Sequence, residues 1–516
     1  MRKKLIWLLP SFIMLMGIAL LFYENYQEVT EPPKQNWSRE IELASTPSTA
    51  DPVVQKKESG MDISYLDENG VTKLSLDESF TIENEHTYQI PYDKWTQFYQ
   101  DEENLIYSDY YGLYDGETDE KISDITRFFP LQKQIIYQEE LEVMLLDPDT
   151  HEPTPLITLD EKETKLSVVE DNDSIYMLTY YNGGGNNQLT FYDITSDGAE
   201  ELGTSEFTVR NSEVVEDINF SIQEDQYSLL LTTNQKQTMS GSPVNFYYFA
   251  QESMNENPEL ELLELHDPNS KGNLTDISDI EFSSADDQTQ ITFKALGSTE
   301  TMYRNERQFN IFEASISEDE AANVSRLSNT PDSSGHPYWI DSETILWFDL
   351  KGDANRMLLA SSDEQVIKQS NQMTMNYFLN TLGKTLGMLS YSFFTLLVGV
   401  IWFIWPMLFL AFIMFGPGNA IDHDKPWIFF SGAGIYLAAA FIFNDRVFTS
   451  TLMARAPDYL SFLASPFVFI SIFALITYAI IALSAKKLDW SVSIRLSYFI
   501  GIHLLFITIF FGPYLL

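Results

Sequence analysis

The spacing of hydrophobic positions divides the chain into three parts. Largely uncharged apolar runs lie at both ends, and a long middle part has short apolar segments separated by polar turns. Each terminal run approaches or exceeds the roughly 20 apolar residues that a helix needs to cross a bilayer. We therefore predict a membrane protein with five spans around a β-rich domain. The runs are Leu5–Tyr23, Leu389–Phe415, Trp427–Phe443, Leu460–Ser484 and Val492–Tyr514.

The first apolar run has the features of an uncleaved anchor. Arg2, Lys3 and Lys4 precede it, and it ends in Phe22-Tyr23-Glu24-Asn25, which offers no small-x-small cleavage site. We expect residues 1–24 to form an N-terminal transmembrane anchor. A cleaved signal peptide is the alternative.

Basic residues predict the orientation of the spans. Cytoplasmic loops of membrane proteins carry an excess of Lys and Arg. If the N-terminus is in the cytoplasm, the segments next to the membrane carry seven basic residues on the cytoplasmic side and two on the extracytoplasmic side. The inside residues are Arg2, Lys3, Lys4, Lys425, Lys486, Lys487 and Arg495; the outside residues are Arg446 and Arg455. This bias predicts a multi-pass protein of the cell membrane with a cytoplasmic N-terminus, an extracytoplasmic C-terminus and a large extracytoplasmic domain.

Two features of the C-terminal spans are candidates for function. His503 is the one ionisable residue well inside a predicted span, so it is either a proton-relay or ligand residue or a bridge to a neighbouring helix. Gly434 and Ala438 lie four residues apart, which places them on one helix face. Small residues at this spacing permit close helix packing and predict an assembly face.

The middle part reads as a flexible extracellular linker at 25–60 and then a β-propeller at 61–370. The linker is rich in Pro, Ser, Thr and charge. Strand–turn units then recur at intervals of roughly 35–60 residues, as the blades of a propeller do. They begin near Trp95, Phe128, Lys165, Ile218, Ile277 and Gly335. We predict six blades, with Asp62–Tyr92 as a seventh or as part of the ring closure.

A pair of β-sandwiches is the alternative for the middle part. Beyond the β-rich domain, residues 371–388 are expected to form a juxtamembrane connector. Residues 389–516 are then expected to form a four-helix membrane domain.

One stretch resembles a known repeat. "RLSNTPDSSGHPYWIDSETILWFDL" resembles the repeat of TolB-type (WD40-like) β-propellers, and Asp279–Ala295 resembles its central portion. The resemblance implies a propeller fold rather than an activity. The chain departs from the repeat where an Asp-Gly turn is usual. The matching residues are Arg326, Leu327, Ser328, Asp332, Pro337, Trp339, Asp341 and Ile345.

Charge and composition indicate which classes of partner and cofactor to expect. The net charge is −44, and residues 23–385 hold 70 acidic and 22 basic residues, a net charge of −48. Such a domain repels phosphate polymers, so we expect no nucleic acid partner. The chain has no cysteine, and its six histidines are scattered without a metal-ligand spacing. We therefore expect neither a metal site nor a cofactor.

Two groups of residues are candidates for binding. Tyr180, Tyr181 and Asn182 open the segment "YYNGGGNN", whose composition is typical of adaptable contact loops or of a loose turn. Asp332, His336 and Trp339 lie near the start of the last predicted blade. They either bind a ligand or organise the blade.

The predicted cytoplasmic parts are too short for a catalytic domain. We therefore predict a non-enzymatic, membrane-anchored binding or assembly protein. Its propeller would engage a protein or envelope ligand, and its C-terminal spans would dock to a membrane partner. Two alternatives stay open: an envelope enzyme that uses paired propeller carboxylates on a polysaccharide, and an accessory subunit of a transporter.

Overall fold

The chain folds into two compact units in a computed structural model. One unit, the propeller, comprises Glu31–Gln372; the other, the helical unit, comprises Met1–Thr30 and Met373–Leu516. The structure describes residues 5–57, 60–171, 174–183, 186–196, 198–223, 225–235, 244–285, 288–298, 307–316, 322–330, 332–352, 354–415, 424–484 and 490–515.

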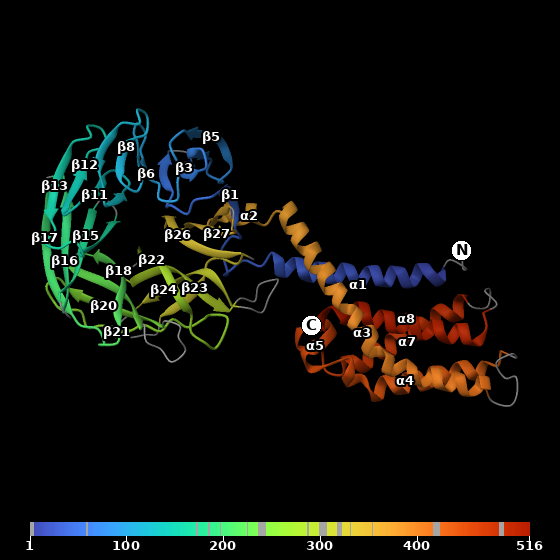
Figure 1. The fold of residues 1–516 in the computed structure, drawn as a ribbon. Helices are drawn as coiled ribbons and strands as arrows, with labels where there is room; N and C mark the ends of the chain where they lie inside the picture. The colour runs from blue at the N-terminus through green and yellow to red at the C-terminus, as the bar shows by residue number, and fades with distance from the viewer. Residues whose placement is uncertain are drawn as a thin grey trace. The chain divides into compact units, whose positions relative to one another are not determined.

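The propeller consists of seven antiparallel sheets of four strands, which follow one another around a ring (Figure 1). The first four blades contain strands in sequence order. Blade 1 is β2 (Val53–Lys57), β3 (Gly60–Asp67), β4 (Gly70–Leu76) and β5 (Ile82–Tyr88); blade 2 is β6 (Gln97–Gln100), β7 (Leu105–Ser108), β8 (Gly112–Asp115) and β9 (Lys121–Asp124). Blade 3 is β10 (Arg127–Pro130), β11 (Ile135–Glu139), β12 (Glu142–Leu146) and β13 (Pro153–Thr158); blade 4 is β14 (Lys165–Asp171), β15 (Ser174–Gly183), β16 (Asn186–Thr195) and β17 (Gly198–Phe207).

Blades 5 and 6 also contain strands in sequence order, and only blade 7 includes a strand from another part of the sequence. Blade 5 is β18 (Val214–Gln223), β19 (Gln226–Gln235), β20 (Val244–Ser253) and β21 (Glu261–Leu262); blade 6 is β22 (Thr275–Ala285), β23 (Gln288–Ser298), β24 (Arg307–Ile316) and β25 (Asn323–Arg326). Blade 7 is β26 (Ser333–Asp341), β27 (Thr344–Leu350), β28 (Asn355–Ser361) and β1 (Ile41–Thr46). The predicted propeller is confirmed, with seven blades.

Strand β1 closes the ring. It pairs antiparallel with β28, so that Ile41 lies opposite Leu359, and it becomes the outer strand of blade 7. Blades 7 and 1 then share one apolar core, in which Leu43, Ile63 and Leu346 are buried. Burial of this surface on both sides of the seam stabilises the closed ring.

The closing strand corrects one expectation. The segment 25–60 was predicted to be a flexible linker, but it supplies β1 and β2 to two different blades. A polar composition is compatible with these strands, because both are short and β1 buries only some of its side chains. Pairing of β1 with the distant β28, and of β2 with the neighbouring β3, therefore orders a segment whose own residues carry little signal.

Strand direction defines two faces of the ring. First strands of neighbouring blades are adjacent, as β22 is to β26, and line the centre of the ring. Because the strands of a blade alternate in direction, the residues that precede first strands share one face with the turns between second and third strands. We call this the front face; it includes Asp51, Trp95 and the turn at Asp109–Tyr111. The start of β1 and the end of β28 lie on the opposite face.

The helical unit contains five main helices and two short ones among the residues described. The main helices are α1 (Leu5–Val29), α3 (Met375–Phe415), α4 (Pro426–Ile442), α7 (Ser465–Ser484) and α8 (Val492–Phe511); the short ones are α5 (Ser450–Arg455) and α6 (Asp458–Ser461). Two 3-10 turns, η1 (Asn444–Arg446) and η3 (Gly512–Tyr514), complete it. Helix α2 (Glu364–Ser370) belongs to the propeller.

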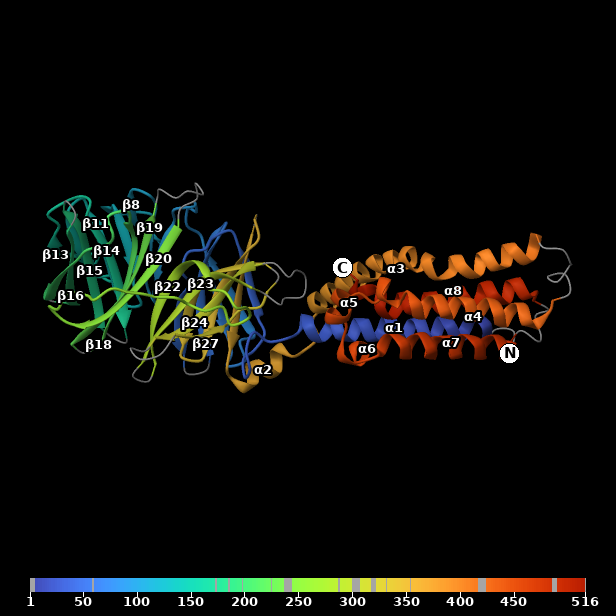
Figure 2. The ribbon, with the colours of Figure 1, turned by 90° about the horizontal axis from the view of Figure 1, so that it is seen from below.

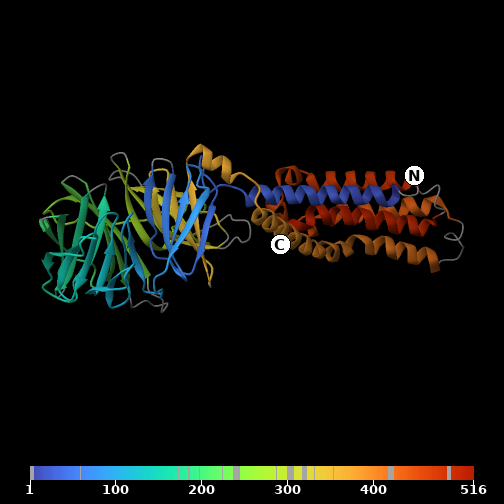
Figure 3. The same ribbon diagram turned by 90° about the horizontal axis from the view of Figure 1, so that it is seen from above.

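Four helices of the described chain are long and apolar enough to cross a membrane. They are α1, α3, α7 and α8, whereas α4 has 17 residues and is shorter. The main helices lie alongside one another in two views (Figures 2 and 3). Their outward surfaces carry large exposed apolar side chains, including Trp7, Phe12, Phe393, Phe412 and Leu475.

The N-terminal helix is part of this bundle rather than a separate anchor. A Cβ at Gly17 of α1 would lie 2.9 Å from Ile509 Cγ2 of α8, so the backbone of α1 packs directly against side chains of α8. Asn25 of α1 donates a 3.0 Å hydrogen bond to Thr385 Oγ1 of α3, and the Lys384 ammonium lies 2.6 Å from the Glu28 carboxylate.

Helix α3 also replaces the predicted connector. It begins at Met375, so most of residues 371–388 continue the helix. The connector looked separate because its polar residues interrupt the apolar run. Thr381 and Thr385 are buried, and each donates its hydroxyl to the carbonyl four residues earlier, which satisfies these groups inside the helix.

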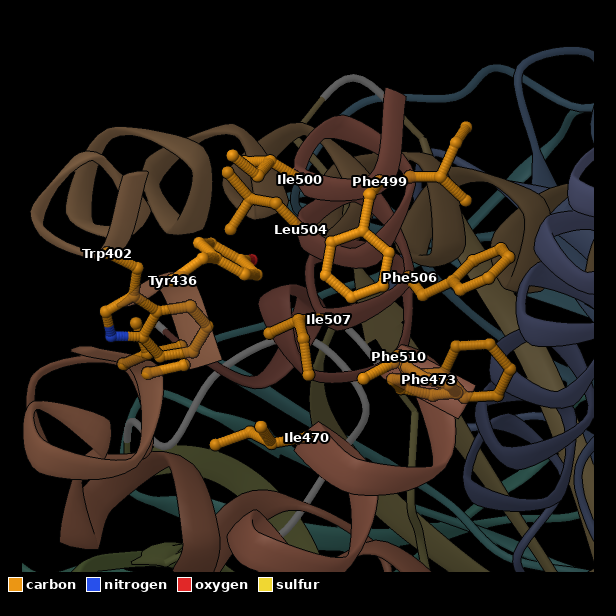
Figure 4. Close-up of a cluster of buried hydrophobic side chains, with 14 of the residues drawn as sticks. Trp402, Tyr436, Ile470, Phe473, Phe499, Ile500, Leu504, Phe506, Ile507 and Phe510 are labelled. Atoms are coloured by element: carbon orange, nitrogen blue, oxygen red, sulfur yellow. The ribbon is translucent and has the colours of Figure 1, made fainter. Parts of the chain in front are cut away.

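The core of the bundle is aromatic and tightly packed (Figure 4). Phe473 of α7 lies between Phe506 and Phe510 of α8, with ring centroids 5.5 and 5.2 Å away. Small residues admit larger neighbours: a Cβ at Gly399 of α3 would lie 2.5 Å from Leu504 of α8. Such small-to-large contacts are typical of helix pairs in membranes.

Candidate functional site

A group of titratable side chains gathers at the centre of the propeller. Asp51 precedes β2, Asp279 and Glu281 lie on β22, and His336 and Tyr338 lie on β26. The His336 backbone N–H donates a 2.9 Å hydrogen bond to Asp279 Oδ2, so these two strands are joined within the group. We call these five residues the central cluster.

Backbone irregularities shape the central cluster. The pairing of β22 with β23 shifts register between Thr275 and Glu281, and the pairing of β26 with β27 shifts between Gly335 and Tyr338. Asp279 and His336 have φ values of 51°, in the left-handed region that few non-glycine residues adopt. Bulges in sheets re-aim side chains and gather near binding and active sites. Two bulged strands therefore meet at the cluster.

Burial and nearby negative charge raise the pKa values of Glu281 and Asp51. Desolvation, followed by the charges of Asp51 and Asp279, raises the pKa of Glu281 to about 8. Asp51 is accessible to solvent, yet enough protein surrounds it that desolvation raises its pKa, while His336 opposes the rise. Desolvation and the nearby carboxylates also raise the pKa of Tyr338. Glu281 is therefore protonated at neutral pH and can donate a hydrogen bond to a ligand.

One basic side chain borders the central cluster. The Lys294 ammonium lies 3.7 Å from Asp279 Oδ2 and 5.2 Å from the centroid of the Phe309 ring. It offsets part of the negative charge on Asp279, but it is not among the groups that act on Glu281 or Asp51. The cluster therefore remains acidic and favours cationic or hydrogen-bonding ligands.

The raised pKa of Glu281 predicts a pH-dependent stability. A carboxyl whose folded pKa lies above its unfolded value of 4.5 stabilises the fold below that value, and this contribution is lost as the pH rises toward 8. Glu281→Gln keeps the neutral shape and removes the titration. We expect the variant to be more stable than the wild type at pH 9 by roughly 1–2 kcal/mol, reduced by solvent screening, and equal to it near pH 4. Hydrogen exchange of residues 275–285 in the full-length protein measures this difference in stability as a function of pH. If the stabilities of the two proteins change with pH in parallel, the prediction is contradicted.

The predicted hairpin-tip residues are divided between core and surface. Tyr180 is buried against Phe207, with ring centroids 6.2 Å apart, and its hydroxyl donates to Asn187 Oδ1 at 2.8 Å. Asn182 donates to the same oxygen at 3.0 Å, and Tyr181 is half-buried. The tip belongs to the front face. Binding there stays a prediction, and Tyr180 contributes to it only through packing.

The three residues predicted near the last blade do not form one group. Asp332 pairs with Arg356 Nη2 at 2.9 Å, and Trp339 Nε1 donates to Thr292 Oγ1 at 2.6 Å, so both connect strands of the propeller. His336 alone joins the central cluster. Its role in binding stays a prediction.

The residues predicted in the helical unit have different surroundings. His503 is buried between helices: its Nε2 donates to the Ile470 carbonyl at 3.0 Å, and its Nδ1 accepts from the Tyr436 hydroxyl at 2.8 Å. A carbonyl can only accept, so Nε2 carries the hydrogen of this bond, and both ring nitrogens of His503 have a partner on a neighbouring helix. Gly434 and Ala438 are exposed, and a Cβ at Gly434 would meet nothing within 4 Å. One face of α4 therefore carries small, exposed residues, and an assembly role for it stays a prediction.

Sequence analysis missed Asp51, Asp279 and Glu281. They come from segments more than two hundred residues apart, and acidic residues are frequent throughout the domain. The available signal was weak: Asp279 and Glu281 are acidic residues on a strand that also carries the TolB-like motif. Among the residues described, no group of three or more His, Asp and Glu is arranged to hold a metal ion.

Comparison with known proteins adds little to this geometry. No family model matches the sequence. No curated protein matches it either. Similar solved structures include the N-terminal domain of Nup159 (11% identity, 64% of this chain and 97% of that chain, TM-score 0.34). The Neurospora crassa Pan2 WD40 domain is similar at 10% identity, over 65% of this chain and 98% of that one, with a TM-score of 0.33.

A third similar structure belongs to an enzyme. Oligopeptidase B from Trypanosoma brucei, with covalently bound antipain, shares 11% identity over 64% of this chain and 48% of that one, with a TM-score of 0.36. At such scores none of these similarities carries an argument about function. The seven-bladed propeller rests on the sheets themselves, and the TolB-type label stays a prediction.

Proposed function

We propose that this chain is a non-enzymatic, membrane-anchored binding or assembly protein. The observation that carries the proposal is the union of a seven-bladed propeller with a helical unit whose outward surface is apolar. Propellers present loops and a central opening as binding surfaces on a rigid ring. The propeller would engage a protein or envelope ligand at the front face or the central cluster.

The helical unit would hold the protein in the cell membrane. Large apolar patches on a soluble surface promote aggregation, whereas lipid accommodates them. We propose five spans, with α4 as the shortest, a cytoplasmic N-terminus and an extracytoplasmic propeller and C-terminus, as the distribution of Lys and Arg favours. Crosslinking in native membranes, with mass spectrometry of the captured proteins, tests the proposal; a chain that captures no partner through either unit contradicts it.

The exposed small face of α4 is the proposed contact with a membrane partner. Gly434→Leu adds a large side chain beside Ala438, at a position where a Cβ would meet nothing within 4 Å. We expect it to reduce co-purification of the partner about 10-fold while the protein still folds, because bulk at a close helix contact separates the backbones. Gly501→Leu on α8 is the matched control, since a Cβ there also meets nothing within 4 Å. Equal recovery from both variants contradicts an α4 docking face.

The central cluster supports a second function, an envelope enzyme that acts on a polysaccharide. A protonated Glu281 beside the carboxylates of Asp51 and Asp279 provides an acid and a base of the kind that glycoside hydrolysis uses. Glu281→Gln should then abolish the release of reducing ends from envelope polysaccharide. Wild-type protein that releases none contradicts this alternative.

A further inference from the structure

Three exposed aromatic side chains form a cluster on blade 2. Trp95, Tyr110 and Tyr111 have 52, 58 and 71% of their surface exposed. The Trp95 and Tyr110 ring centroids lie 5.3 Å apart, and those of Tyr110 and Tyr111 lie 4.9 Å apart. We call these residues the aromatic triad. It belongs to the front face, because Trp95 precedes β6 and the two tyrosines form the turn between β7 and β8.

Aspartates hold the triad in place. Asp93 Oδ1 accepts from the Trp95 backbone N–H at 2.7 Å, and Asp109 Oδ1 accepts from the Tyr111 backbone N–H at 2.7 Å. The backbone at Trp95 and the backbone at Tyr111 are therefore each fixed in a turn by an aspartate two residues earlier. Rings that are exposed and already ordered lose little entropy when they bind, which makes them effective contact residues. None of the three is required for the blade core, where Phe98 and Leu105 are buried.

The charge of the surroundings indicates what the triad binds. Residues 93–124, which contain blade 2, include ten acidic and two basic side chains. One of the two basic groups, the Lys94 ammonium, lies 4.5 Å from the centroid of the Trp95 ring. A cation is attracted to the face of an indole ring. Lys94 thus occupies, within the chain, the kind of position that a cationic ligand would take.

We infer that the aromatic triad docks a basic segment of a partner protein, with Arg or Lys side chains placed on its rings. The acidic blade attracts such a segment over distance, and the rings bind its cations and their apolar stems. Arg fits better than Lys, because a planar guanidinium stacks on aromatic faces. This inference rests on the proposed function of the propeller as a binding module and names the chemistry of its partner.

A labelled oligo-arginine peptide tests the inference on full-length protein in detergent, by fluorescence anisotropy at increasing NaCl concentration. We expect Trp95→Ala to weaken binding by about 3- to 30-fold, whereas Lys94→Ala strengthens it, because it frees the ring and removes a repelling charge. Binding should fall with salt, and oligo-lysine should bind less well than oligo-arginine. Leu262→Ala, at an exposed apolar residue of blade 5, is the control and should change nothing.

Two results overturn the inference. Equal affinity of wild type and Trp95→Ala for oligo-arginine shows that attraction to the acidic domain is unspecific. The second result concerns a neutral chito-oligosaccharide. If it binds independently of salt, and if Trp95→Ala abolishes that binding without changing the affinity for the peptide, the triad binds glycan instead. Crosslinking in native membranes distinguishes failure of this inference from failure of the proposed function. If wild type and Trp95→Ala capture the same partner, the triad is not the docking site, but the proposed binding function still holds. If neither captures a partner, the proposed binding function is contradicted.

Discussion

Asp349→Ala is expected to destabilise the propeller by about 3–5 kcal/mol. The Asp349 carboxylate is fully buried in blade 7 and accepts four hydrogen bonds. Its pKa is raised by burial to about 6, so it is ionised at pH 7.5. Removing it leaves three buried donors and the half-buried guanidinium of Arg356 without this acceptor. The donors are Thr330 Oγ1 (2.9 Å), Ser334 Oγ (2.9 Å), Trp347 Nε1 (3.2 Å) and Arg356 Nη2 (2.9 Å).

Asp341→Ala in the same blade is the matched control. Asp341 is half-buried, accepts one backbone bond from Glu343 at 2.9 Å and lies 3.7 Å from the Lys56 ammonium. Ion pairs of such partly exposed groups contribute about 0–1 kcal/mol. Denaturant unfolding of full-length protein, followed by hydrogen exchange of peptides from blade 7, measures both variants. Similar losses from the two would show that the buried network does not dominate the stability of this blade.

Gly399→Leu is expected to disrupt the helical unit. The position faces α8 so closely that even a methyl group would approach within 2.5 Å of Leu504 Cδ1. A leucine there forces α3 and α8 apart, and overpacking of this kind costs about 1–3 kcal/mol or more. We expect a lower melting temperature in detergent and a smaller yield of folded protein. Size-exclusion chromatography and thermal unfolding of the purified chain report these changes.

Gly387→Leu on the same helix separates packing from helix propensity. A Cβ at Gly387 meets nothing within 4 Å, so the added side chain enters open space. Replacing an exposed helical glycine also raises helix propensity. The control should therefore be as stable as the wild type or slightly more so. A loss of stability at Gly387 equal to that at Gly399 would contradict the close contact between α3 and α8.

The propeller was predictable because its strands repeat a local pattern. Runs such as those at Trp95, Lys165 and Ile277 alternate apolar and polar residues between acidic turns, and each lies in or immediately before the blade that it predicted. Strand β1 was not predictable in this way. Six residues in a polar segment become a strand only because β28 offers them a partner, and that partner lies more than three hundred residues away.

The binding surfaces were less predictable than the blades. His336 was found through its motif, but Asp51, Asp279 and Glu281 become neighbours only when the ring forms. The aromatic triad had a local signal: an aspartate two residues before an aromatic residue, in a turn where the core needs no ring. Asp93 with Trp95 and Asp109 with Tyr111 both follow this pattern.

The closing strand also sets an order of events during synthesis. Ile41 leaves the ribosome long before its partner Leu359, and at 5–20 residues per second the delay is about 15–60 s. All other blades can form from consecutive residues in that time, whereas blade 7 must wait for the chain to return. The ring is therefore sealed last, by the part of the domain that was made first. Until then the nascent protein exposes the unpaired edge of β1, which is the period when it most needs protection from other chains.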